Sequence, residues 1–231
     1  MATTMTFADR AAAGAALAEA LVARPSVSPG ASSTDEPDGG RRPIVVLGIP
    51  RGGVPVAAAA ARRLGARLDV LVAHKVGAPG EPELAIGAVA ADGSVRREAW
   101  ASSYATDAAF AVAAAAEIGR ARARETALRA GRPAVPLLGA TAILVDDGVA
   151  TGSTMLVAIQ AARRAGAGRV LAAVPVAAAS AVAALRAEAD DVVALLVPAH
   201  FMAVGEWYDR FDQLGDREIR DLLAALASDP G

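Results

Sequence analysis

The sequence has no cysteine and only two histidines, His74 and His200. The absence of cysteine excludes disulfides, thiolate catalysis and cysteine metal sites, and two histidines are too few for a histidine-rich zinc site. Aromatic residues make up 3% of the chain, whereas hydrophobic residues make up 54%. The core is therefore expected to be aliphatic, with helices packed tightly on a sheet.

The chain also lacks a large excess of either charge, with a net charge of −2 and a pI near 5.7. The chain as a whole therefore has no net positive charge with which to hold nucleic acid or an anionic membrane. The longest uncharged stretch, residues 170–185, contains Pro175 and is shorter than the roughly 20 residues of a spanning helix. Charges also interrupt the apolar pattern of the N-terminal segment, unlike a secretory signal. We expect a soluble, cytoplasmic protein with no nucleic-acid or membrane partner.

The length of 231 residues fits one α/β domain with additions better than two full domains. Residues 1–23 predict an N-terminal helix that packs on the domain. Residues 24–43 are rich in proline, glycine, serine and aspartate, which is typical of a flexible linker. Residues 44–231 then form the main domain, including a C-terminal segment.

From residue 44 onward, short apolar runs alternate with helical patterns. Strands are predicted at residues 44–49, 68–73, 141–145, 170–174 and 192–197, and helices at residues 54–65, 108–130, 153–165 and 178–187. Residues 74–84 contain too much glycine and proline for a helix and predict a long loop before a short strand at 85–89. The arginines of the 108–130 helix are interpreted as a solvated face. The alternation predicts a largely parallel sheet with helices on both faces.

Three polar loops follow predicted strands: IPRGG, HKVGAPG and DDGVATGST. In open parallel sheets, ligands bind beyond the carboxyl ends of the strands. The three loops are therefore expected to converge at one edge of the sheet.

The segment ILVDDGVATGSTM, residues 143–155, ends an apolar run with Asp146 and Asp147. Adjacent carboxylates suit the vicinal hydroxyls of a sugar, and the start of the following helix suits a phosphate. Together they indicate a phosphorylated ribose. The lysine of a Walker loop, the dinucleotide glycine pattern and the hydrolase elbow are all absent. The alternative is an ordinary turn whose Ser and Thr residues cap the helix.

This segment closely resembles the phosphoribosyl diphosphate (PRPP) signature of the type I phosphoribosyltransferases. GIPRGGVPVA, KVGAPGEPELAIGAVA and FMAVGEWY are similar to further landmarks of one bacterial branch whose acceptor is generally unassigned. The resemblance implies a three-layer α/β sandwich with a mostly parallel sheet and one antiparallel strand at residues 85–89. It also implies a small hood, built from the N- and C-terminal segments, over the acceptor site.

By this resemblance, Asp146 and Asp147 hold the ribose 2′- and 3′-hydroxyls. The 5′-phosphate loop comprises Gly148, Val149, Ala150, Thr151, Gly152, Ser153 and Thr154, and the diphosphate loop comprises Pro50, Arg51, Gly52 and Gly53. The diphosphate loop of family members often has a strained or cis peptide. The alternative for residues 50–53 is a tight turn that opens a helix.

The resemblance further implies that Arg51 and Lys75 neutralise the departing diphosphate, and that residues 74–83 form a mobile lid over the reacting centre. Lys75 is the one lysine among 23 basic residues, and its compact ammonium suits a diphosphate that gains charge. Mg²⁺ is expected to bind through PRPP oxygens and water, with no direct protein ligand.

His200, Phe201, Trp207 and Tyr208 are the candidate acceptor or hood residues. The aromatic side chains form either a stacking platform for a base or packing that fixes the tail to the domain. The hypoxanthine-guanine branch has a carboxylate where this sequence has Ala150, so 6-oxopurine salvage is not favoured.

The expected function is transfer of a 5-phosphoribosyl group from PRPP to a nitrogenous acceptor, with release of diphosphate. One alternative is a regulatory protein of the same fold that senses PRPP or a nucleotide without turnover. A second is a degenerate enzyme that hydrolyses PRPP or a nucleotide. The acceptor is unassigned, and the oligomeric state, including a homo-oligomer, stays open.

Overall fold

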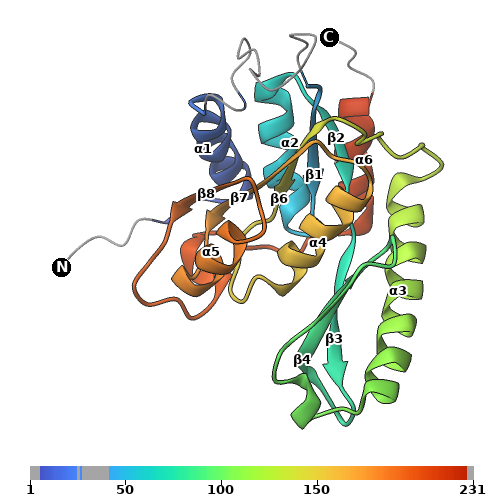
Figure 1. Ribbon diagram of the computed structural model, residues 1–231. Helices are drawn as coiled ribbons and strands as arrows, with labels where there is room; N and C mark the ends of the chain where they lie inside the picture. The colour runs from blue at the N-terminus through green and yellow to red at the C-terminus, as the bar shows by residue number, and fades with distance from the viewer. Residues whose placement is uncertain (1–5, 25–26, 28–41, 228–231) are drawn as a thin grey trace.

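The computed structural model of the protein describes residues 6–24, 27 and 42–227. Most of the predicted linker, residues 24–43, lies outside the described residues. The described chain forms a layered body and an arm that extends from it (Figure 1).

The body is built on a five-stranded sheet in the order β2-β1-β6-β7-β8, and every pair of neighbouring strands is parallel. The strands are β1 Ile44–Gly48, β2 Arg67–Val70, β6 Thr141–Val145, β7 Arg169–Val176 and β8 Asp191–Leu196. Their apolar runs have few polar residues because both faces of the sheet are covered. The predicted strands and the predicted fold class are confirmed, except that the strand predicted at residues 68–73 ends at Val70.

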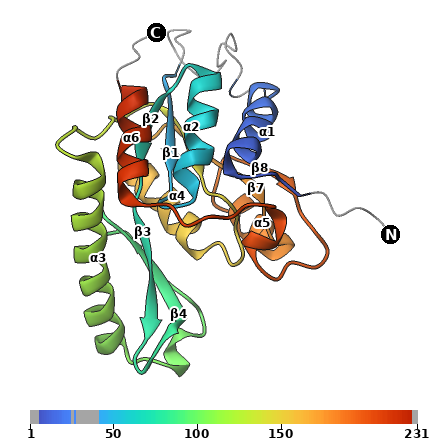
Figure 2. The same ribbon diagram turned by 180° about the vertical axis from the view of Figure 1, so that it is seen from behind.

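Alternate residues of each strand face opposite layers, as the pleat requires. Val46 packs with helices α1, α2 and α6, whereas Leu47 packs with α4 and α5. Figures 1 and 2 show these two helical layers from opposite sides. The helices are α1 Arg10–Val22, α2 Gly53–Leu64, α4 Ser153–Arg164, α5 Ala179–Arg186 and α6 Asp216–Ala227. No helix in the described part of the chain is both long and apolar enough to cross a membrane.

The arm is a second, antiparallel sheet in the order β3-β4-β5, with helix α3 packed along it (Figure 2). Its elements are β3 Ala73–Ala78, β4 Glu81–Ala90, β5 Val95–Arg97, the short 3-10 helix η1 Ala101–Ser103 and α3 Asp107–Arg129. The antiparallel part thus has three strands in a sheet of its own, rather than the one strand expected.

The long loop predicted for residues 74–84 is wrong, because this segment forms most of the β3–β4 hairpin. The register of the hairpin shifts around Gly77, where a Cβ would overlap the backbone of Pro82. Glycine is therefore needed for close backbone approach, and proline is tolerated near the end of a strand at an irregularity. The glycine and proline content marks an irregular hairpin rather than a loop.

The interpretation of the α3 arginines as a solvated face is wrong for Arg124 and Arg129, whose side chains are 29% and 19% exposed, whereas Arg122 is exposed and still hydrogen-bonded. Arg122 donates to the carbonyl of Ala91, and Arg129 donates to the carboxylate of Asp69 and the carbonyl of Val70. Arg120, which is 65% exposed, fits the original interpretation. The long apolar stems of arginine let a charged side chain join two packed elements.

The N-terminal segment of the described chain lies beside residues 207–209, which precede helix α6. The N–H of Phe7 donates to Trp207 O at 2.8 Å, and the N–H of Asp209 donates to Phe7 O at 2.8 Å. Trp207 ends the short 3-10 helix η2 Val204–Trp207. The two segments expected to form the hood therefore meet. Helix α6, which follows them, was not predicted.

Candidate functional site

The acidic pair lies at the carboxyl end of β6, at the edge where parallel strands place ligands. Asp146 Oδ1 accepts the backbone N–H of Asp147 at 2.8 Å. Burial raises the pKa of Asp146 well above its usual value, and the neighbouring charge of Asp147 raises this pKa further. Two adjacent carboxylates therefore resist being ionised together unless a positive group or hydrogen-bond donors approach them.

The predicted diphosphate loop lies directly against this pair. A Cβ added to Gly52 would overlap the carboxylate of Asp147, and one added to Gly53 would overlap the backbone at Val145. The peptide bond between Pro50 and Arg51 is cis, as the family resemblance implies. Glycine at these two positions lets the loop backbone approach the acidic pair closely.

The predicted phosphate loop connects β6 to helix α4. Val149 is fixed by backbone hydrogen bonds to Val176 and Ala178, whereas Gly152 adopts a φ of 88° at the helix N-cap. Within the described residues, the backbone N–H groups of Ala150, Thr151 and Gly152 have no acceptor. These free donors and the positive end of the helix dipole favour an anion at this position.

Glu98 is a site residue that the sequence analysis did not identify. It follows β5 in the arm, and its carboxylate accepts the hydroxyl hydrogen of Ser153 in the phosphate loop. A serine hydroxyl has one hydrogen to donate, so Glu98 and a bound phosphate compete for the Ser153 donor. No local sequence pattern signals this contact, because 55 residues separate the two side chains.

The predicted charged catalytic residues are exposed. Arg51 lies in the loop beside the acidic pair, and Lys75 lies on β3 opposite Ala88. Ala88 packs in the same core cluster as helix α4, so Lys75 occupies the α4 face of the arm. Neither side chain has a hydrogen bond or ion pair among the described residues. Both groups are available to an anion.

The aromatic side chains of the tail mainly pack. Tyr208 is buried against Phe7, with ring centroids 5.7 Å apart, and its hydroxyl donates to the carbonyl of Asp147. Trp207 and Phe201 pack against the same cluster. His200 is exposed and has no hydrogen bond in the described part of the chain. The geometry favours the packing interpretation for Tyr208.

Arg10 is a second residue that the sequence analysis did not identify at the site. It is the first residue of α1, and its Nε donates to Asp147 Oδ2 at 2.8 Å. Both side chains are largely buried, at 13% and 14% exposed. This ion pair brings the N-terminal helix to the acidic pair.

Comparison with known proteins agrees with this geometry. The family model for the phosphoribosyl transferase domain matches residues 31–204. The chain belongs to this family. Two Mycobacterium tuberculosis proteins with provisional phosphoribosyl transferase names, from strains CDC 1551 / Oshkosh and ATCC 25618 / H37Rv, are each 43% identical to it over 178 residues, 76% of this chain. The chain spans 40% of the length of these curated relatives.

One solved structure is similar to this chain along nearly its whole length. The crystal structure of TT1426 from Thermus thermophilus is 43% identical and superposes with a TM-score of 0.76. The match covers 96% of this chain and 99% of that one. The similarity therefore includes the arm and the terminal segments as well as the sheet.

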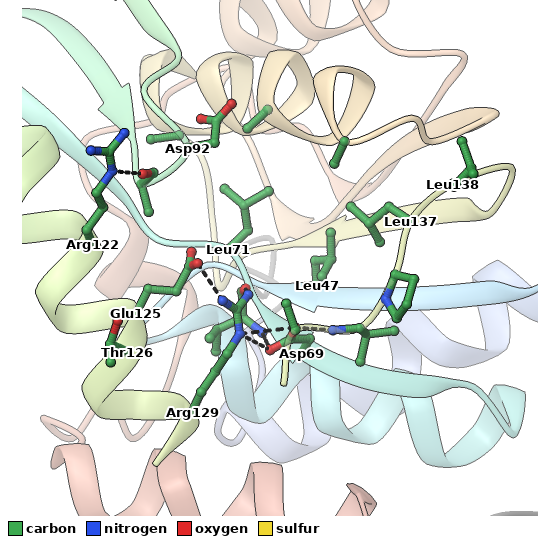
Figure 3. Close-up of a pocket in the computed structure, with 18 residues that line it drawn as sticks. Leu47, Asp69, Leu71, Asp92, Arg122, Glu125, Thr126, Arg129, Leu137 and Leu138 are labelled. Carbon is green, nitrogen blue, oxygen red and sulfur yellow. Dashed lines mark hydrogen bonds and ion pairs between the residues drawn. The ribbon is translucent and has the colours of Figure 1, made fainter. Parts of the chain in front are cut away.

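A cavity of about 590 Å³ lies away from the acidic pair, at the joint between the arm and the body. Figure 3 shows its charged wall, where Arg129 reaches Asp69 and Glu125. Leu71 and Leu137 line its apolar side. The carboxylate of Asp69 is fully occupied by hydrogen bonds from Arg129 and from the backbone N–H groups of Val70 and Val135. This wall serves to join the arm to the body.

Proposed function

We propose that the protein is a PRPP-dependent phosphoribosyltransferase that acts on a nitrogenous acceptor. In the reaction, the bond between ribose C1 and the diphosphate oxygen breaks and a bond from C1 to the acceptor nitrogen forms. The bonding electrons leave with diphosphate, and the acceptor nitrogen loses its proton. The names of the M. tuberculosis relatives support the phosphoribosyl class of this transfer.

The observation that carries the proposal is the close approach of the diphosphate loop to the acidic pair. Gly52 lies against the carboxylate of Asp147, and the phosphate loop begins at Gly148, the next residue. At one edge of the sheet, carboxylates that can accept hydrogen bonds from hydroxyl groups therefore lie between two loops that can donate hydrogen bonds to anions. A 5-phosphoribosyl diphosphate has its sugar hydroxyls between two phosphorylated ends in the same way.

The protein residues hold the reactants and stabilise the charge that develops. In the proposed complex, Asp146 and Asp147 accept the ribose hydroxyls, and the N–H groups of Ala150 to Gly152 hold the 5′-phosphate. Arg51 and Lys75 approach the diphosphate, whose negative charge increases as it leaves. Placing such donors in advance is the main way in which enzymes stabilise charged transition states.

Mg²⁺ is proposed as the accompanying ion. Among the described residues, no group of three His, Cys, Asp or Glu side chains is placed to hold a metal. As expected from the sequence, the ion would take its ligands from PRPP oxygens and water, as Mg²⁺ commonly does at phosphate sites. When bound, the ion would supply positive charge that neutralises the diphosphate.

A screen of acceptors tests this function. The protein is mixed with PRPP and Mg²⁺, and diphosphate release is followed with purines, pyrimidines and other nitrogen nucleophiles in turn. The proposal predicts release that depends on one acceptor class and is lost in the Asp146→Asn, Asp147→Asn double variant. PRPP binding without release for any acceptor would instead support a sensing protein, and release that needs no acceptor would indicate a hydrolase.

A further inference from the structure

The ion pair between Arg10 and Asp147 comes from a part of the chain that the family match does not include. The match covers residues 31–204, whereas Arg10 lies before it and its other partners, Phe211 and Asp212, lie after it. The N-terminal helix and the C-terminal tail thus reach the site from outside the matched domain.

Arg10 is fixed on three sides. Its Nε donates to Asp147 Oδ2 at 2.8 Å, and its Nη1 donates to the carbonyl of Asp212 at 2.7 Å. The guanidinium carbon lies 3.8 Å from the centroid of the Phe211 ring, a cation–π distance. A planar guanidinium held in this way has one orientation, so it fixes the carboxylate that it binds.

The segments that hold Arg10 are themselves joined at the same point. The backbone ladder between Phe7 and residues 207–209 brings Tyr208 beneath the acidic pair, where its hydroxyl donates to the carbonyl of Asp147. Burial raises the pKa of Tyr208, so its phenol stays a donor at neutral pH. Tyr208 thus holds the carbonyl of Asp147, and Arg10 holds its carboxylate.

The acidic pair requires a positive neighbour. Ribose hydroxyls bind most strongly to an ionised carboxylate, but two adjacent carboxylates oppose each other's ionisation. Arg10 is the one cationic side chain with an ion pair to either aspartate among the described residues. In the same part of the chain, no N–H group and no alcohol or phenol hydroxyl donates a hydrogen bond to Asp147 Oδ1. The carboxylate can therefore bind Arg10 through one oxygen and a sugar hydroxyl through the other.

We propose that Arg10 is a positioning residue of the ribose subsite, which orients the carboxylate of Asp147 so that it accepts a sugar hydroxyl. This inference rests on the proposed function, because it presumes that a ribose phosphate binds at the acidic pair. It makes the N-terminal helix a part of the sugar-binding site rather than only a cover for the acceptor. Arg10 stays paired with Asp147 when the sugar is bound.

Calorimetric titration with ribose 5-phosphate tests this role in two folded variants. Arg10→Gln keeps a hydrogen-bond donor but removes the charge. Arg10→Lys keeps the charge but removes the planar guanidinium and its several N–H donors. We expect about tenfold weaker binding for Arg10→Gln, the loss of one charged hydrogen bond, with part of the affinity recovered in Arg10→Lys. The matched control is Arg63→Ala. It removes an exposed arginine of α2 that pairs with Glu19 of α1, the helix that carries Arg10, and it is expected to leave the affinity unchanged.

A pH profile separates positioning from simple packing. The titratable and charged groups at Asp147 are Asp146, Arg10 and Tyr208. Burial and the charge of Asp147 raise the pKa of Asp146, and the charge of Arg10 opposes this rise. The rise of ribose 5-phosphate affinity with pH should therefore move upward in Arg10→Gln and not in Arg63→Ala. A loss of packing alone would lower the affinity equally at every pH.

In the wild-type protein, NMR detection of the Arg10 Nε–H group in saturating ribose 5-phosphate gives a measurement that needs no variant. The inference predicts that the Nε–H signal of Arg10 stays shifted from that of free arginine and exchanges slowly with solvent when the ligand is bound. Its return to the position of free arginine, or equal or tighter binding in Arg10→Gln, would overturn the inference while the proposed function stands. Failure of the wild type to bind either ribose 5-phosphate or PRPP would overturn both.

Discussion

Two carboxylate sites of the protein, Asp69 in β2 and the acidic pair after β6, differ in how their oxygens are used. Asp69, at the joint of the arm, accepts hydrogen bonds from Arg129 at 3.0 and 3.2 Å, from the Val70 N–H at 2.8 Å and from the Val135 N–H at 2.9 Å (Figure 3). Both of its oxygens are occupied. Such a group serves the fold, because it has no capacity left for a ligand.

The acidic pair at the end of β6 has spare capacity. Asp146 accepts one backbone N–H, and Asp147 accepts Arg10 through one oxygen. The pKa of Asp146 is raised by burial and by the charge of Asp147. A structural carboxylate whose oxygens all accept hydrogen bonds would not be expected to have a raised pKa. Unused acceptor capacity beside the two predicted anion loops, rather than burial of charge alone, makes the acidic pair the candidate ligand site.

The largest effect is expected from breaking the structural carboxylate site. Arg129→Ala leaves Asp69 buried without its counter-charge, which should lower the free energy of unfolding by about 3 kcal/mol. Urea unfolding measures the loss, and ribose 5-phosphate affinity of the folded variant should stay at the wild-type value. Arg120→Ala, which removes an exposed arginine of the same helix, should change neither. A marked loss of ligand affinity in folded Arg129→Ala would contradict the division between the two sites.

The next effect concerns the loop that lies on the acidic pair. Gly52→Ala places a methyl group where the carboxylate of Asp147 now lies, so ribose 5-phosphate binding should weaken roughly a hundredfold, because the carboxylate must move away from both Arg10 and the sugar. The control is Gly119→Ala in α3, where a Cβ meets no atom within 4 Å and should stabilise the helix slightly. Calorimetry on both variants provides the test, and wild-type affinity in Gly52→Ala would refute the close packing of the loop.

A smaller effect, and one opposite in sign to that of Arg129→Ala, is expected for the stability of Asp146→Asn. Because the folded pKa of Asp146 lies above the usual 3.8, the carboxyl is neutral in both states at lower pH and costs nothing. As the pH rises from 3.8 through the folded pKa, the unfolded state ionises first and the wild type loses stability. Unfolding at a series of pH values should show Asp146→Asn gaining stability relative to the wild type over that window. A constant difference would contradict the raised pKa.

The smallest effect is expected at the phosphate loop. Glu98 holds the single hydroxyl hydrogen of Ser153 and places a negative charge beside the phosphate site. Glu98→Gln should therefore tighten binding of inorganic phosphate about threefold, less than the value of one neutral hydrogen bond. Isothermal titration detects the change. Weaker binding in this variant would show that Glu98 supports the loop instead of competing for its donor.

Much of the fold follows from the sequence because local patterns decide it. The apolar runs that become β1, β6 and β7 are bounded by the polar loops that end them, and helix α2 ends at Gly65 in the left-handed conformation. The hairpin of the arm was missed because glycine and proline at a register shift look, in sequence, like the residues of a loop. The α3 arginines were misinterpreted because an arginine pattern does not show whether a carboxylate faces it.

The acidic pair and both loops were predicted because each motif is continuous in the chain. Arg10 was not predicted, because 137 residues separate it from Asp147 and the sequence around it is that of an ordinary helix start. Its contact depends on the N-terminal segment and the tail meeting beside β7 and β8, which is decided by packing of the whole chain. Contacts of this kind become visible only when the elements are placed in space.

The most direct test of the account is calorimetric titration of PRPP with Mg²⁺ into the wild type and the Asp147→Asn variant, with inorganic diphosphate as the second ligand. If the acidic pair holds the ribose, the variant should bind PRPP at least about tenfold more weakly, the value of a charged hydrogen bond, and should bind diphosphate as the wild type does. Equal PRPP affinity in the two folded proteins would contradict the assignment of the acidic pair to the sugar.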